Sequence, residues 1–192
     1  MFVVAAVLAI ASQVAQLRAV ASSGPPPAPQ AQPAPAPQAR PGPRMLDVDR
    51  ELLHGDYVWD ERGAPPGRIS ILVDISAQTL SVFRGDREIG RAIILYGTDE
   101  QPTPLGTFRI TEKDADHESN LYEAQMPYML RLTNDGIAIH GSIVEYGKAS
   151  RGCVGVPDEF AALLFEQARL GDVVTIVAGG PPPARALNGS LI

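Results

Sequence analysis

The chain has 192 residues, of which 45% are hydrophobic, and a formal charge of −6 at pH 7. This length and composition fit one globular domain of ordinary size with additional segments. Residues 1–45 contain three arginines and no acidic residue, so the rest of the chain holds all of the acidic excess. An acidic domain argues against nucleic acid as a partner. The single cysteine excludes a disulfide within the chain.

The N-terminal segments have the composition of an export signal followed by a spacer. Residues 1–21 are largely apolar and end on the small residues Ala19-Val20-Ala21, although no basic residue precedes Arg18. We expect a signal peptide or an N-terminal anchor, a possible tether to the inner membrane, and a location in the periplasm or cell envelope. Residues 22–45 hold nine prolines between positions 24 and 43, which predicts an extended, semi-rigid linker.

Residues 46–67 form a lead-in to the main domain. The spacing of their aliphatic residues fits a short helix, and the aromatic side chains are expected to pack on the domain. The residues concerned are Leu46, Val48, Leu52 and Leu53 for the helix and Tyr57 and Trp59 for the packing.

From residue 68 the apolar pattern alternates with a period of two, as in β-strands. Strands are expected within 69–75, 80–82, 92–96, 107–111, 137–140 and 172–177. Pro157 followed by Asp158 and Glu159 predicts the start of a helix. The fold expected for residues 68–178 is therefore mainly β with a short helix, a β-sandwich or barrel-like domain. The polar residues 113–125 are expected to form a solvated loop or a flap, and residues 179–192 a disordered tail.

Cys153 and His140 are the strongest candidates for chemistry. His140 ends an expected strand, and a glycine-rich stretch joins it to Cys153. A thiol with a nearby imidazole is the minimum of a cysteine nucleophile with its base, because the thiolate reacts and a free thiol titrates near ~8.5. The alternative is a small buried cysteine and an ordinary hydrogen-bonded histidine. His54 and His117 show no ligand-like spacing to Cys153, so no metal is expected.

Four short motifs occur in order around this pair. They are T-P-L-G-T-F at 103–108, M-P-Y-M at 126–129, G-I-A-I-H-G at 136–141 and S-R-G-C-V at 150–154. Together they resemble the catalytic domain of the L,D-transpeptidase family over about residues 68–178. Two positions differ from the family pattern: Arg151 stands where the family has histidine, and Gly155 where it usually has arginine or asparagine.

The resemblance implies an enzyme of cell-wall cross-linking or remodelling that acts on peptidoglycan stem peptides. Cys153 would be the nucleophile that forms a thioester, and His140 the general acid and base. The carbonyl of Gly141 would orient His140, and the backbone of Gly152 would contribute to an oxyanion hole. Substrate binding would involve Ser150 and Tyr128. The family uses neither a cofactor nor a metal.

Arg151 keeps hydrogen-bond donors but is permanently charged, so we expect it to favour the Cys153 thiolate and to depress the thiol pKa. Two alternatives stay open. One is a hydrolase on the same fold, an L,D-carboxypeptidase or endopeptidase. The other is a non-catalytic wall-binding module, which Arg151 and Gly155 suggest. The sequence does not indicate an oligomeric state.

Overall fold

The computed structural model describes residues 42–119 and 124–179. The expected signal peptide or anchor, nearly all of the expected linker and nearly all of the expected tail lie outside these residues. Among the residues described, no helix has the length and apolar character needed to cross a membrane.

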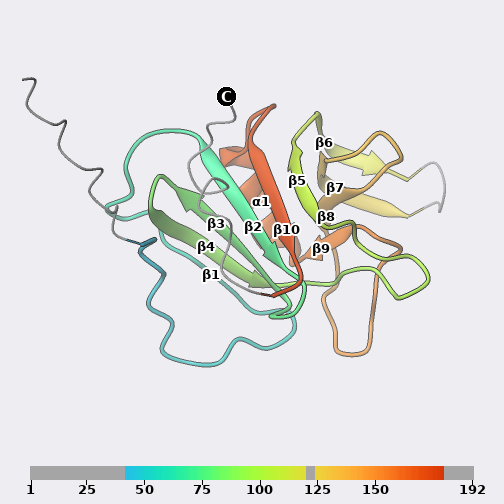
Figure 1. Ribbon diagram of the computed structural model, residues 1–192, viewed down its shortest axis with the longest axis horizontal. Helices are drawn as coiled ribbons and strands as arrows, with labels where there is room; N and C mark the ends of the chain where they lie inside the picture. Colours follow the sequence, from blue (N-terminus) through green and yellow to red (C-terminus); the bar gives the residue numbers. More distant parts are fainter. Residues whose placement is uncertain (1–41, 120–123, 180–192) are drawn as a thin grey trace, which may run out of the picture. The chain divides into compact units, whose positions relative to one another are not determined.

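The larger of two β-sheets has six strands (Figure 1). They are β1 (Tyr57–Trp59), β2 (Ile69–Asp74), β3 (Thr79–Arg84), β4 (Arg87–Ile93), β5 (Gly106–Arg109) and β10 (Val173–Val177). Their order across the sheet is β1-β4-β3-β2-β10-β5, and only β2 and β10 are parallel neighbours. The last strand of the domain therefore lies inside the sheet, between β2 and the edge strand β5.

The smaller sheet carries the segments with the sequence motifs. Its strands are β6 (Glu112–Glu118), β7 (Gln125–Arg131), β8 (Ala138–Gly141) and β9 (Val154–Val156). They lie in the order β6-β7-β8-β9, antiparallel except for the parallel pair β8 and β9. Strands β6 and β7 form a hairpin.

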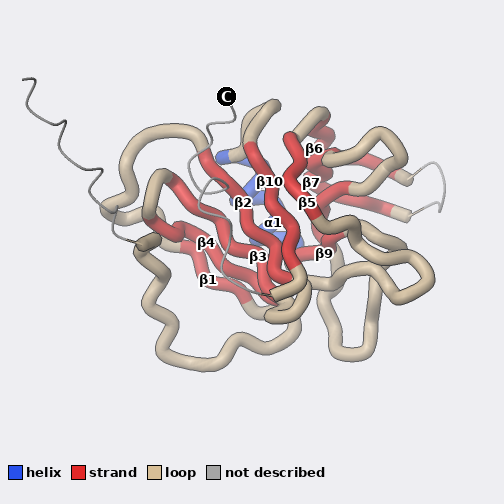
Figure 2. Tube along the Cα trace, viewed as in Figure 1, coloured by secondary structure: helices blue, strands red, loops and turns tan. Residues whose placement is uncertain are grey.

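Helix α1 (Asp158–Gln167) connects the two sheets. It follows Pro157 and has Asp158 and Glu159 in its first turn, as the sequence predicted. Its buried face packs on β7 and β8, while the Phe160 ring makes edge contacts with Tyr57 and Trp59 of β1. Figure 2 shows this helix, in blue, against the strands. The expected packing of both aromatic residues on the domain is confirmed.

One hydrophobic core joins both sheets and the helix. The alternation in β2 is confirmed, because Ile69, Ile71 and Val73 all have buried side chains in that core. Val156 of β9 and Phe160 of α1 are fully buried in the same cluster. The predicted fold class, mainly β with a short helix in a sandwich-like arrangement, is therefore confirmed.

Lys113 ties the base of the β6–β7 hairpin to the C-terminal end of α1. Its ammonium group donates to the carbonyls of Phe165 at 2.6 Å and Ala168 at 2.5 Å. The same nitrogen lies 4.3 Å from the centroid of the Phe165 ring. Since the last carbonyls of a helix have no partner within the helix, a lysine at this end satisfies them and complements the helix dipole.

Three expectations about the elements were wrong. Residues 46–53 form no helix, and the lead-in instead adds β1 to the edge of the larger sheet. The strand expected at 92–96 begins earlier, at Arg87. Much of the polar stretch expected to be a solvated loop is strand β6, whose backbone pairs with β7 from Glu112 to Glu118.

Candidate active site

Strands β8 and β9 bring the candidate nucleophile and base together. Cys153 immediately precedes β9, and the parallel register places His140 opposite Gly155. Cys153 is two residues before Gly155, and side chains alternate along an extended chain. Cys153 and His140 therefore project from the same face of the smaller sheet, and both line one pocket.

The His140 ring is held in one orientation by the adjacent peptide group. Its Nδ1 lies 2.7 Å from the carbonyl oxygen of Gly141, so Nδ1 carries the proton that is donated to that oxygen. In the neutral ring, Nε2 is then an acceptor. Burial lowers the pKa of His140, although the Gly141 carbonyl and the charge of Asp158 act in the opposite direction. The ring is therefore neutral at pH 7 and able to take a proton.

Position 141 has room only for glycine. A Cβ added to Gly141 would lie 2.5 Å from a carboxylate oxygen of Asp158 and 3.0 Å from the Cγ atom of Pro127. Real side chains do not approach so closely. The carbonyl that orients His140 thus depends on close packing between β7, β8 and the start of α1, and the predicted role of the Gly141 carbonyl agrees with this geometry.

The Cys153 thiol is half-buried and protonated. Burial raises its pKa, while the Ala138 backbone and the charge of Arg131 favour the thiolate, and Asp135 opposes it. The sulfur donates a weak hydrogen bond to the Gly136 carbonyl over 3.7 Å. At neutral pH the pair is therefore a thiol beside a neutral imidazole, not a thiolate–imidazolium ion pair.

One expectation about the site is corrected by these electrostatics. The pKa of Cys153 is raised, not depressed, because burial outweighs the nearby positive charge. The charge of Arg131 of β7, which the sequence did not single out, favours the thiolate. Arg151 is exposed and lines the rim of the same pocket.

Ser150 shapes the loop before Cys153. Its hydroxyl donates to the Cys153 carbonyl at 2.5 Å and accepts from the Gly152 N–H at 3.2 Å. Gly152 has a φ of 107°, and a Cβ there would lie 2.7 Å from the Ile137 side chain. Since the Gly152 N–H is engaged within the loop, the structure corrects the expectation that it points at a reacting carbonyl.

The T-P-L-G motif supports this loop through hydrogen bonds to the segment that pairs with it. Ser150 donates its N–H to the Tyr96 carbonyl at 2.8 Å, and Gly97 forms an isolated bridge with Ser150. The buried Gly97 N–H donates in turn to the Thr103 hydroxyl at 2.9 Å. The motif threonine therefore fixes the segment after β4 that pairs with the cysteine loop.

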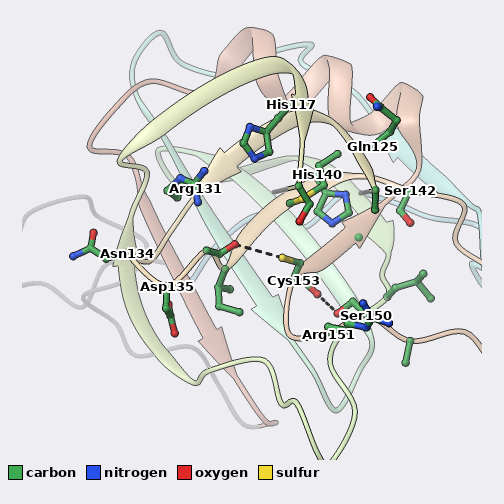
Figure 3. A pocket seen from close by; sticks show the side chains of 18 residues that line it. His117, Gln125, Arg131, Asn134, Asp135, His140, Ser142, Ser150, Arg151 and Cys153 are labelled. Carbon is green, nitrogen blue, oxygen red and sulfur yellow. Dashed lines mark hydrogen bonds between the residues drawn. The ribbon is translucent and has the colours of Figure 1, made fainter. Parts of the chain in front are cut away.

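The pocket has a volume of about 730 Å³ and opens between the hairpin and the cysteine loop (Figure 3). Four predicted site residues line it: Cys153, His140, Ser150 and Arg151. Tyr128 does not. Its ring packs against the Phe165 ring instead, with the two centroids 5.9 Å apart. The structure therefore gives no support to its predicted part in substrate binding.

Several pocket residues were not found from the sequence. Strand β6 contributes His117, β7 contributes Gln125 and Arg131, and the turn after β7 contributes Asp135. The signal available was the pair Asp114 and His117, which joins a carboxylate to an imidazole three residues away. Within residues 42–119 and 124–179, no three acidic, histidine or cysteine side chains gather as a metal ion would require.

Comparison with known proteins agrees with this fold. The family model of the L,D-transpeptidase catalytic domain (YkuD) matches residues 68–176. L,D-transpeptidase 1 of Mycobacterium tuberculosis is 24% identical over 123 residues, which are 55% of this chain and 49% of that protein. The chain therefore spans about half the length of this curated relative.

Solved structures show the same fold. The L,D-transpeptidase of Stackebrandtia nassauensis superimposes with a TM-score of 0.55 at 24% identity, over 62% of this chain and 59% of that one. The L,D-transpeptidase LdtMt1, in complex with imipenem, gives 0.54 at 23% identity, over 57% and 58%.

Fold and pocket thus define a mainly β protein with a thiol and an imidazole in one cleft. Since the family model covers more than half of its length, the chain belongs to the L,D-transpeptidase catalytic-domain family. The resemblance inferred from the four sequence motifs is confirmed.

Proposed function

We propose that this protein is a cysteine acyltransferase that acts on peptidoglycan stem peptides in cell-wall cross-linking or remodelling. One observation carries the proposal: Cys153 and His140 face one pocket, and Gly141 binds Nδ1 of the ring so that Nε2 is left as the acceptor. A nucleophile, a base and a group that orients the base are the three parts of an activated nucleophile.

In the first half of the reaction, His140 takes the thiol proton as the Cys153 sulfur attacks the carbonyl of a stem-peptide bond. The C–N bond then breaks, and His140 returns the proton to the departing amine, which leaves a thioester on Cys153. The neutral state of both groups means that this proton moves during the attack, not before it. Burial of the thiol keeps it unreactive until a substrate is bound.

In the second half, an amine of a neighbouring stem attacks the thioester. The C–S bond breaks, a new amide forms and the thiol is regenerated. Water in place of the amine would give hydrolysis. The balance between transfer and hydrolysis therefore depends on how easily water and the acceptor amine each reach the thioester. No cofactor takes part in either half.

We further propose that the protein acts in the cell envelope, outside the cytoplasm. The apolar start of the chain, the Ala19-Val20-Ala21 triplet and the proline-rich segment support this location. A reporter fused after residue 45 that is active only in the cytoplasm would contradict it.

The decisive experiment is intact-protein mass spectrometry with imipenem, because a matching structure is a complex with this compound. Wild type should gain one covalent adduct at Cys153, and Cys153→Ala should gain none. A stem tetrapeptide should then give cross-linked product with an acceptor amine and tripeptide without one. Tripeptide alone under both conditions would identify a hydrolase, and wild type without adduct or turnover would indicate a binding module.

A further inference from the structure

The β6–β7 hairpin places a second imidazole in the pocket. His117 of β6 lies directly opposite Met126 of β7, and residues opposite each other in a sheet point to the same face. Met126 packs in the small buried cluster that Cys153 contacts. His117 therefore faces the side of the sheet that holds Cys153, and it lines the pocket together with His140 (Figure 3).

A carboxylate holds His117 in the orientation of a base. The ring nitrogen Nδ1 lies 3.1 Å from Oδ2 of Asp114, and only 15% of the His117 side chain is exposed. In a neutral ring, a proton on Nδ1 is donated to the carboxylate and Nε2 is left as an acceptor.

The second half of the proposed reaction requires more than one proton acceptor. A primary alkylamine has a pKa near that of lysine, about 10.4, so the acceptor arrives as an ammonium ion. It must lose one proton before it can attack and a second as the amide forms. His140 takes the second proton and passes it to the sulfur, so the first must go to solvent directly or by way of another group in the pocket.

We propose that His117, oriented by Asp114, is a further catalytic residue that deprotonates the acceptor ammonium. This inference rests on the proposed function of the site. The ammonium gives one proton to Nε2 of neutral His117 and becomes a neutral amine. The amine nitrogen forms a bond to the thioester carbon, and its second proton moves to His140. The C–S bond breaks, the sulfur takes the proton from His140, and His117 releases its own proton to solvent.

The charges around the pocket are consistent with His117 taking the first proton and His140 the second. Besides Asp114, the charged or titratable groups at the pocket are Arg131, Asp135, His140, Arg151 and Cys153. The two imidazoles influence each other, because the charge of His117 lowers the pKa of His140. A protonated His117 thus helps to keep His140 neutral, in the state that accepts the second proton.

The test compares two acceptors in wild type and in His117→Gln. Each protein is supplied with stem tetrapeptide and with either a primary alkylamine or hydroxylamine. The nitrogen of hydroxylamine is already largely neutral at pH 7. We expect the variant to transfer to the alkylamine about 10²-fold more slowly, the lower end of general-base contributions, with little change for hydroxylamine. The loss should diminish as the pH rises towards the pKa of the alkylamine. Asp114→Asn should show the same selectivity with a smaller loss.

His54→Gln is the matched control, because the His54 ring makes an edge contact with Tyr146 outside this pocket. Equal losses for both acceptors in His117→Gln, or no loss, would overturn the inference. Imipenem labelling separates the two proposals: a normal adduct in both proteins shows that acylation and folding are intact. A wild-type protein without an adduct would overturn the proposed function and this inference with it.

Discussion

The hydroxyl of Ser150 donates to the backbone carbonyl of Cys153, three residues ahead, across 2.5 Å. The same oxygen accepts the Gly152 N–H, so one side chain closes the loop that presents the nucleophile. The S-x-G-C motif therefore has a structural meaning: serine spans the turn and glycine adopts the φ of 107° that the turn requires. We assign Ser150 to loop geometry as well as to the pocket wall.

Replacement of Ser150 by alanine should destabilise the protein and slow acylation. Both loop hydrogen bonds are lost, and we expect a loss of about 1–3 kcal/mol in the free energy of unfolding, measured in urea. Ser150→Thr keeps the hydroxyl and is the control; it should retain most of the stability and of the imipenem acylation rate. Equal defects in both variants would show that the loop depends on side-chain size and not on the hydroxyl.

The Cys153 thiol should be unreactive at neutral pH in the free protein. Because burial raises its pKa above the ordinary value of 9.0, iodoacetamide alkylation should rise only in alkaline solution. Arg131→Gln removes a charge that favours the thiolate and should shift the profile to still higher pH. A reactive plateau at neutral pH, or an unchanged profile in Arg131→Gln, would contradict this assignment.

Acidification should reveal the buried neutral state of His140. Its pKa in the folded protein is lowered, so its contribution to stability is present above the unfolded value of 6.5 and is lost as the pH falls through the folded value. Urea unfolding from pH ~7 to ~4 should show this loss, and it should be smaller in His140→Gln. Imipenem acylation should fall over the same range below pH 6.5 as the base becomes protonated. An acylation rate that declines already well above 6.5 would require a raised pKa.

A methyl group at position 141 should damage both stability and chemistry. Gly141→Ala pushes a Cβ against Asp158 and Pro127, and overpacking of this kind costs about 1–3 kcal/mol. The displaced carbonyl would no longer orient His140, so acylation should fall more than stability alone explains. Gly42→Ala is the control, since nothing lies within 4 Å of its added Cβ. Thermal unfolding and imipenem labelling of both variants measure the two effects.

The elements predicted correctly from the sequence are those whose own residues show an apolar pattern or a helix-start signal. Strand β2 buries Ile69, Ile71 and Val73 at every second position, and α1 begins with proline and two acids, so both were correctly placed. Strand β6 reads Glu-Lys-Asp-Ala-Asp-His-Glu and shows no apolar alternation. It is a strand because β7 supplies its backbone partners, and that pairing is not visible within β6 itself. The three-residue strand β9 was missed because it is too short to show a period.

The candidate site divides in the same way. Cys153 and His140 were found because a short motif contains each of them. Arg131 and His117 were missed because they enter the pocket through the register of the hairpin, which sets neighbours that are distant in sequence. Arg151 was singled out because it lies close to the cysteine in sequence, whereas in the folded chain burial is the largest influence on the pKa of Cys153 and Arg131 favours the thiolate.

Helix α1 touches the site at both of its ends. Asp158 at its start lies against Gly141 and acts on the charge of His140, and Phe165 and Ala168 near its finish hold Lys113 at the root of the hairpin. The ten-residue helix is therefore a spacer of fixed length between the base and the wall that carries His117. One inserted residue would lengthen it by about 1.5 Å and turn its far end by roughly 100°. A helix that lines none of the pocket thus contacts both the base and the hairpin that carries His117, so an insertion in it should disturb both sides of the cleft.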